Sequence, residues 1–200
     1  MKRFLVAVLI TLFFLPSVGA QSAPEEVSLY GIDISISNDF PLGPYQSISP
    51  YNLGLSGRAS MNLLSMPGWR PWVELDNNWW LVSPAWISWG TQINALLGLS
   101  ISTTVATFEG IGNLETGVSV GYGGMFHIAS AKTTGTNANI YSFIDQVVTV
   151  SIPTVLKLSG SNLGIIFEPR YLISPERSEI KQQIGVLLGM RIVFADQKAE

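Results

Sequence analysis

The chain contains no cysteine, only one histidine and few charged residues. The absence of cysteine excludes disulfides, a cysteine zinc site and a lipid-modified cysteine that could anchor the chain. Charged residues make up only 12% of the sequence, which is low for a surface that faces water. No phosphate loop, nucleotide motif or metal-ligand constellation occurs, so we expect no cofactor and no metal.

The first twenty residues have the pattern of a secretory signal peptide. Lys2 and Arg3 form a basic start, an apolar run follows, and small residues up to Ala20 offer a cleavage site. We expect residues 1–20 to be removed and residues 21–200 to form one domain. Nine basic against 14 acidic side chains would then remain, which gives no reason to expect nucleic acid as a partner.

The rest of the chain alternates between apolar and polar residues, as strands with one apolar face do. No stretch beyond the signal peptide approaches eighteen apolar residues, so a closed barrel is the other way for this apolar chain to span a bilayer. We therefore predict an all-β fold, an eight-stranded antiparallel up-and-down transmembrane β-barrel over about 27–194, with a short tail at 195–200. The expected strands are 27–37, 52–63, 69–76, 89–101, 114–130, 140–158, 163–173 and 184–194.

An even number of strands brings both termini to the same side, which would be the periplasmic side. The expected periplasmic turns are then 65–68, 103–113 and 159–162, and the expected outer loops are 38–51, 77–88, 131–139 and 174–178. Three prolines conflict with this scheme because a closed barrel has no edge strand to accept them. Pro71 and Pro153 could lie near the periplasmic rim, and at Pro169 we expect a bulge or a local break.

Every charged residue inside a proposed strand falls on the polar face. Acids and bases in balance suit a narrow lumen in which they pair, because an unpaired buried charge is costly. We expect Glu168 to be a partner of Arg191, and His127 to pair with Asp145. The predicted lumen charge network comprises Asp33, Arg58, Arg70, Glu74, Glu115, His127, Asp145, Glu168, Arg170 and Arg191, and Asp76 shares their face.

All six tryptophans lie between Trp69 and Trp89, at or near the expected outer ends of the third and fourth strands. Tryptophan prefers the membrane interface, where its ring and its N–H group are both accommodated. We therefore expect Trp69, Trp79 and Trp89 to be interface aromatics in contact with outer-membrane lipid.

Taken together, the chain resembles the small eight-stranded outer-membrane barrels of the OmpW- and OmpX-like class, over about 27–194. The closing segment Gly189-x-x-Ile192-x-Phe194 partly matches the signal read by the barrel-assembly machinery, although Phe194 lies six residues before the end. The resemblance implies an outer-membrane protein of a diderm bacterium that meets the assembly machinery during biogenesis.

Three functions are compatible with such a barrel, whose interior has room only for side chains or one small ligand. The first is an OmpW-like conduit that binds or passes small apolar solutes. The second is a scaffold whose outer loops bind an external ligand or host partner, as an adhesin does. Exposed apolar loop residues support either reading. The candidates are Phe40, Leu42, Tyr45, Tyr51, Trp80 and Trp86.

The third function is an envelope enzyme that modifies lipids. Some barrels of this size, the lipid A deacylases, use a His-x-Ser pair, and the only histidine here lies in the sequence Phe126-His-Ile-Ala-Ser130. Ser130 is one residue too far from His127 for that spacing, and it falls on the opposite face of the strand. A hydrogen bond between His127 and Asp145 in the lumen is the simpler interpretation, so we expect no enzymatic activity.

Overall fold

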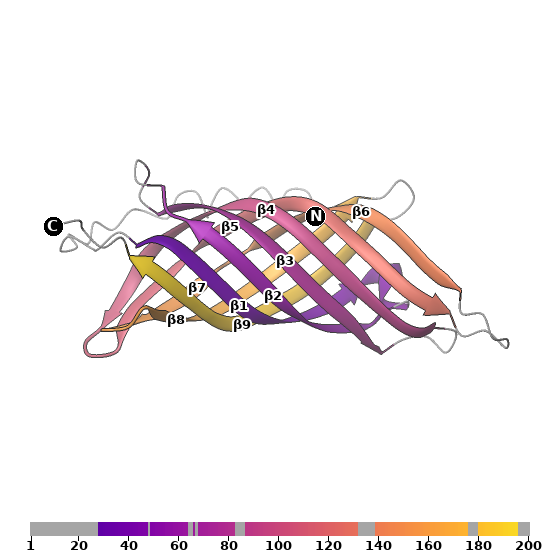
Figure 1. Ribbon diagram of the computed structural model, residues 1–200, viewed down its shortest axis with the longest axis horizontal. Helices are drawn as coiled ribbons and strands as arrows, with labels where there is room; N and C mark the ends of the chain where they lie inside the picture. The colour runs from indigo at the N-terminus through magenta and orange to yellow at the C-terminus, as the bar shows by residue number, and fades with distance from the viewer. Residues whose placement is uncertain are drawn as a thin grey trace.

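The computed structural model describes residues 28–47, 49–63, 66, 68–82, 87–131, 139–175 and 180–195. These residues form an elongated barrel of long tilted strands (Figure 1). A short 3-10 helix, η1 (Gly43–Ser47), follows the first strand. The strands are β1 (Ser28–Leu42), β2 (Tyr51–Met61), β3 (Trp69–Val82), β4 (Ile87–Phe108), β5 (Gly112–Ala131), β6 (Ile140–Ser151), β7 (Thr154–Leu158), β8 (Leu163–Pro175) and β9 (Ile180–Ala195).

The strands close into a ring in which β1 pairs with β9 and every pairing is antiparallel. The segments β6 and β7 are two parts of one strand, because both pair with β5 and β8 in an unbroken register. The ring therefore has eight strands, which confirms the predicted fold class.

The strands are staggered by ten residues around the ring. Following paired residues from Thr103 of β4 once around the barrel returns to Ile93 of the same strand. With eight strands, this stagger corresponds to a tilt of about 40° and a rise of about 2.5 Å per residue along the barrel axis. The intermediate residues on this path are Thr116, Thr154, Phe167, Leu188, Ile36, Leu55 and Asn77.

This stagger shows that one hairpin extends beyond the barrel at the end where the termini of the described barrel, Ser28 and Ala195, lie. Thr103 is level with the first residues of β1, β3 and β8 and with the last residues of β2 and β9. The β4–β5 hairpin continues past Thr103 to a turn at 109–111, about 15 Å beyond this rim. Figure 1 shows the hairpin reaching farther left than the ends of β1, β2 and β9.

Several strands are longer than the sequence predicted, and the expected loops are correspondingly shorter. The expected loop 38–51 begins only after Leu42, and most of the expected loop 77–88 belongs to β3 and β4. The expected turn 103–113 is largely the paired hairpin of β4 and β5. These predicted boundaries are wrong because the ladder continues through uncharged Asn, Thr and Trp residues at the strand ends.

The prolines interrupt the ladder beside Pro169, where the sequence predicted a bulge or a local break. β8 passes through Pro169 with no register shift against β9, but its pairing with β6 and β7 breaks at Glu168 and Pro169. The interruption lies in the neighbouring strand at Ile152 and Pro153, between β6 and β7. Each proline removes one N–H donor, but Ile152 still donates to the Pro169 carbonyl and Gly117 donates to the Pro153 carbonyl.

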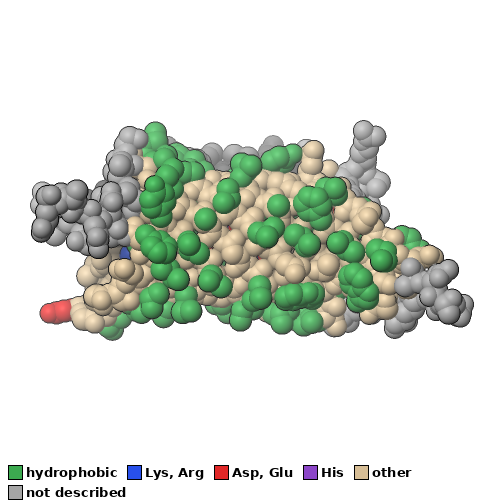
Figure 2. All heavy atoms as spheres, in the orientation of Figure 1, with side chains coloured by type: hydrophobic (Ala, Val, Ile, Leu, Met, Phe, Trp, Pro, Cys, Tyr) green, Lys and Arg blue, Asp and Glu red, His purple; other side chains and the backbone are tan. Residues whose placement is uncertain are grey.

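The two faces of the wall differ sharply in chemistry. Outward side chains are mostly large and apolar, whereas polar and charged side chains are buried inside the ring. Figure 2 shows hydrophobic side chains over the whole visible face, with charged side chains visible only near its left end. Among the described residues, no helix has the length and apolar character needed to cross a membrane.

Candidate functional site

The candidate site is the interior of the barrel, where the charged side chains gather. All ten residues of the predicted lumen network are inside, and none is more than 9% exposed. Alternation along each strand explains this, because a residue two positions along points to the same face. The interior also buries Asp39 and Asp76.

Inside the lumen, Arg58 on β2 binds carboxylates from two other strands. Its guanidinium donates to Glu74 on the adjacent strand at 2.7 Å and to both carboxylate oxygens of Glu168 at 2.7 and 2.8 Å. Glu168 is on β8, so this bidentate pair crosses the barrel and joins two distant strands. Ser151 donates to the same carboxylate at 2.6 Å.

Arg170 on β8 binds two further carboxylates and also Glu74. It donates to Asp39 at 2.7 and 3.1 Å, to Asp76 at 2.6 Å and to Glu74 at 3.2 Å. Glu74 therefore bonds to both arginines, Arg58 and Arg170, and links their partners into one network. Asp39 was missed by the sequence analysis because it lies beyond the expected end of the first strand, although the alternation of Ser37 and Asp39 continues the inward face.

Arg191 pairs with Asp33, which is directly opposite it on the neighbouring strand β1. Its guanidinium donates to both oxygens of Asp33 at 2.7 Å. The expected pairing of Arg191 with Glu168 is therefore wrong. Although β8 and β9 are neighbours, Arg191 lies opposite Gly164 and Glu168 lies opposite Leu187, so the two charges are at different levels.

Near the rim where the termini lie, Glu115 is shared by two bases. Arg70 Nη2 is 3.1 Å from one carboxylate oxygen and the Lys157 ammonium contacts the other. Arg70 also donates through Nε to Asn62.

At the opposite mouth, His127 Nε2 lies 3.2 Å from Asp145 Oδ2, and Lys181 donates to the same oxygen at 2.7 Å. The histidine ring stacks on Phe143, with centroids 4.4 Å apart. The sequence analysis brought His127 and Asp145 together but did not include Lys181, which lies ahead of the expected closing strand. A carboxylate shared by a histidine and a lysine is an ion-pair arrangement that needs no catalytic role.

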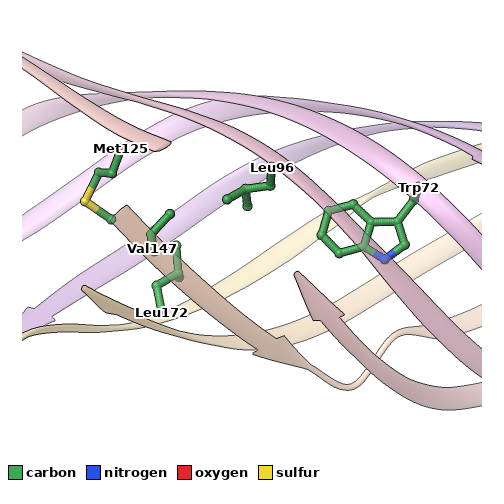
Figure 3. Close-up of a cluster of buried hydrophobic side chains, with 5 residues drawn as sticks. All are labelled: Trp72, Leu96, Met125, Val147 and Leu172. Atoms are coloured by element: carbon green, nitrogen blue, oxygen red, sulfur yellow. The ribbon is translucent and has the colours of Figure 1, made fainter. Parts of the chain in front are cut away.

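Apolar side chains fill the space that the charges leave. Trp72 donates through Nε1 to Ser119 at 2.9 Å, and a Cβ added at Gly98 or Gly121 would lie 2.3 Å from Trp72 atoms. These glycines therefore make room for the indole. The apolar cluster comprises Trp72, Leu96, Met125, Val147 and Leu172, of which Met125, Val147 and Leu172 lie close together in Figure 3.

The cavities found between these side chains are small. Two lie near the rim where the termini are, and each has a volume of about 10 Å³. That is room for about one water molecule. Within the described part of the chain, no group of three or more His, Asp or Glu side chains is placed to hold a metal ion.

Aromatic residues form two outward-facing girdles on the barrel. Tyr30, Trp69 and Phe194 lie at the rim near the termini, and Phe40 and Trp79 lie about ten residues farther along the axis. The separation is about 25 Å, which matches the apolar band of outer-membrane barrels. Trp69 is therefore at the opposite end from Trp79, which corrects the expectation that the tryptophans share the outer ends of two strands. Trp89, 48% exposed, lies beyond the second girdle.

The predicted outer-loop residues separate into different environments. Phe40 is in β1 and packs against Tyr51 of β2 with ring centroids 5.1 Å apart, and Leu42 ends β1. Trp80 is wrong as a loop residue, because it lies in β3 with its side chain buried against Ile87 and Ala129. The side chain of Tyr45 and all of Trp86 lie outside the described residues.

Comparisons with known proteins identify the fold but not a family. No protein-family model matches the sequence, and no curated protein matches it either. The structure is similar to Neisserial surface protein A, NspA, at 10% identity with a TM-score of 0.60, covering 82% of this chain and 97% of that one. It is also similar to Ail, the attachment invasion locus protein of Yersinia pestis, at 8% identity with a TM-score of 0.54, covering 83% and 100%.

The chain has the fold of the small eight-stranded outer-membrane barrels. At these identities the likeness concerns the fold alone. A second structure of Ail, in complex with the heparin analogue sucrose octasulfate, has a TM-score of 0.52 at 8% identity and covers 83% of this chain and 100% of that one. Any function must therefore be argued from the residues of this chain.

Proposed function

We propose that this protein spans the outer membrane as a scaffold that presents its outer end to an external ligand or host partner. The observation that carries the proposal is the network of charges across the lumen, in which Arg58 and Arg170 of opposite walls share Glu74. A solute passing through the barrel would have to break several buried ion pairs, which are strongly unfavourable to separate.

The apolar outer face supports the membrane location. Its aromatic girdles are about 25 Å apart, and its mid-wall residues such as Val73, Leu75 and Leu97 are at least 60% exposed. Such a surface would be unstable in water but suits lipid. The closing strand β9 carries the segment that resembles the assembly signal, and it docks on β1 to complete the ring.

The end of the barrel away from the termini is the end available to external partners. There β3, β4, β5 and β6 continue beyond the second girdle, and they carry exposed apolar residues such as Leu81, Trp89 and Ile140. Exposed apolar side chains at a strand end favour contact with a partner rather than with water. This is the feature that favours binding at the outer end over passage through the lumen.

Two measurements test the proposal. The purified protein in planar bilayers should give no stepwise conductance, and cells of a heterologous diderm strain displaying it should adhere to cultured epithelial cells or to immobilised heparin. Chimeras in which 83–86 and 132–138 are replaced by short Gly-Ser linkers should keep the barrel but lose adherence. Stepwise conductance of the wild type, or adherence unchanged in the chimeras, would contradict the scaffold function.

The alternative of a conduit for small apolar solutes has one specific observation in its favour. The exposed Phe40 packs against the half-buried Tyr51 at the outer girdle, where an apolar solute in transit could first bind. Solute flux into liposomes containing the protein separates the two functions. Flux above that of empty vesicles would support the conduit function, and flux equal to that of empty vesicles would support the scaffold function.

A further inference from the structure

A polar vestibule opens at the rim where the termini lie. The two small cavities of this region lie side by side, because Ser60, Arg70 and Arg191 line both, and together they are called the vestibule. On one side the recess is lined by Ser102 of β4 and by Lys157 of β7, which pairs with Asn113 of the β4–β5 hairpin, so the hairpin extends beyond this side. The opposite side is lower, because β1 and β9 stop at the rim.

The charges around this vestibule are predominantly positive. Arg191 is neutralised by Asp33, whereas Arg70 and Lys157 share the single carboxylate of Glu115. One positive charge is therefore left over within this group. Side chains of Arg70 and Lys157 are only 11% and 24% exposed, so the surrounding water screens this charge incompletely.

The size and the position of the vestibule limit which ligands can bind there. Each cavity has room for about one oxygen atom, with hydroxyl donors nearby on Ser60 and Ser102. The recess opens past Tyr30 and Val193, at the level of the aromatic girdle. That level is the membrane interface, where the phosphate groups of phospholipids lie.

We propose that this vestibule binds a phosphate group, with Arg70 and Lys157 holding one of its oxygens. The vestibule lies at the membrane interface and opens over the low rim of β1 and β9, so the headgroup of an anionic phospholipid in the facing leaflet can enter from the side. A free phosphate ion has the same chemistry and enters from the water below the rim. Phosphate oxygens bind arginine and lysine through short charge-assisted hydrogen bonds.

The site is tested with the full barrel in nanodiscs of phosphatidylcholine that contain increasing amounts of phosphatidylglycerol. Lipid retained by the protein is measured by native mass spectrometry, and heat-induced unfolding is measured with and without millimolar inorganic phosphate. Wild type should retain phosphatidylglycerol in preference to phosphatidylcholine, and Lys157→Gln should reduce that preference by roughly three- to tenfold. Lys157→Arg should keep it.

Lys181→Gln is the matched control, because Lys181 is the other partly buried lysine that pairs with a lumen carboxylate, at the opposite mouth. Its lipid preference should equal that of wild type. If inorganic phosphate stabilises the wild type but not Lys157→Gln, and neither prefers phosphatidylglycerol, the vestibule is a phosphate site whose ligand is free phosphate. A folded Lys157→Gln variant that behaves as wild type in both measurements, or an equal loss in Lys181→Gln, would overturn the proposal.

Discussion

Replacement of Arg170 by methionine is expected to be the most damaging single change in the lumen. Arg170 is 4% exposed and makes four hydrogen bonds, to Asp39, Glu74 and Asp76. Glu74 keeps Arg58, and Asp76 keeps its bonds from neighbouring Ser and Asn side chains. Asp39, fully buried, would lose the partner that donates to both of its carboxylate oxygens.

The magnitude follows from the cost of leaving a buried charge without its partner, about 3–5 kcal/mol. That is a large part of the total stability of an ordinary domain, about 5–15 kcal/mol. The free energy of unfolding is measured by urea titration in lipid vesicles, with the heat-modifiable band on SDS gels as the readout of the folded barrel. Arg191→Met is the comparison, because it also leaves one buried carboxylate, Asp33, without its arginine but removes two hydrogen bonds instead of four, so it should cost less.

The double variant Arg170→Met/Asp39→Asn distinguishes this explanation from a general packing defect. Neutralising Asp39 removes the orphaned charge, so the double variant should regain about 1–2 kcal/mol relative to Arg170→Met. If Arg170→Met unfolds within about 1 kcal/mol of wild type, or the double variant is no more stable than the single one, the network does not hold the barrel as argued.

The structure also predicts the effects of four further substitutions, Gly121→Ala, Leu97→Arg with its control Ile111→Arg, and His127→Ala. Gly121→Ala should destabilise the barrel by about 1–3 kcal/mol because its Cβ would lie 2.3 Å from the Trp72 ring, and the urea midpoint should fall accordingly. Leu97→Arg, at a side chain 63% exposed near the middle of the apolar band, should cost about 2–4 kcal/mol in vesicles, whereas Ile111→Arg beyond the rim should cost almost nothing. His127→Ala should leave the acylation of lipid A unchanged when measured by mass spectrometry, and altered acylation would support the enzyme alternative.

The alternation of the sequence was sufficient to predict which face of each strand is buried. Asp33, Arg58 and Arg191 all point inward as predicted, because a two-residue period ties each side chain to its neighbours on the strand. The closed ring was predicted from a different feature, an apolar chain without a run long enough for a transmembrane helix. The facing of each side chain depends on local alternation alone, which a single sequence displays.

The sequence could not predict which charges meet. Arg191 pairs with Asp33 on β1 instead of Glu168 on β8, although both strands adjoin β9. Which carboxylate Arg191 meets depends on the register between neighbouring strands. The number of residues between two charges in the sequence does not determine that register. Strand ends were also misjudged, because Asp39 and Trp80 lie where polar and aromatic residues suggested a loop while the ladder in fact continues.

At mid-height the lumen has a charged side and a side with apolar residues, and together they fill it. The carboxylates Asp39, Glu74 and Asp76 come from β1 and β3, and the arginines that bind them come from β2 and β8. Across from them, β4, β5 and β6 contribute Leu96, Met125 and Val147, and Trp72 of β3 and Leu172 of β8 complete the apolar cluster.

Because Arg58 and Glu168 join opposite walls, the charged side acts as a set of cross-links over the bore, and Trp72 fills the space between these pairs and the apolar side. Widening the bore would therefore separate ion pairs and expose apolar side chains in the same movement. Both changes are unfavourable. The interior thus stabilises the barrel, and contact with external ligands is left to its two ends, the outer mouth and the rim vestibule.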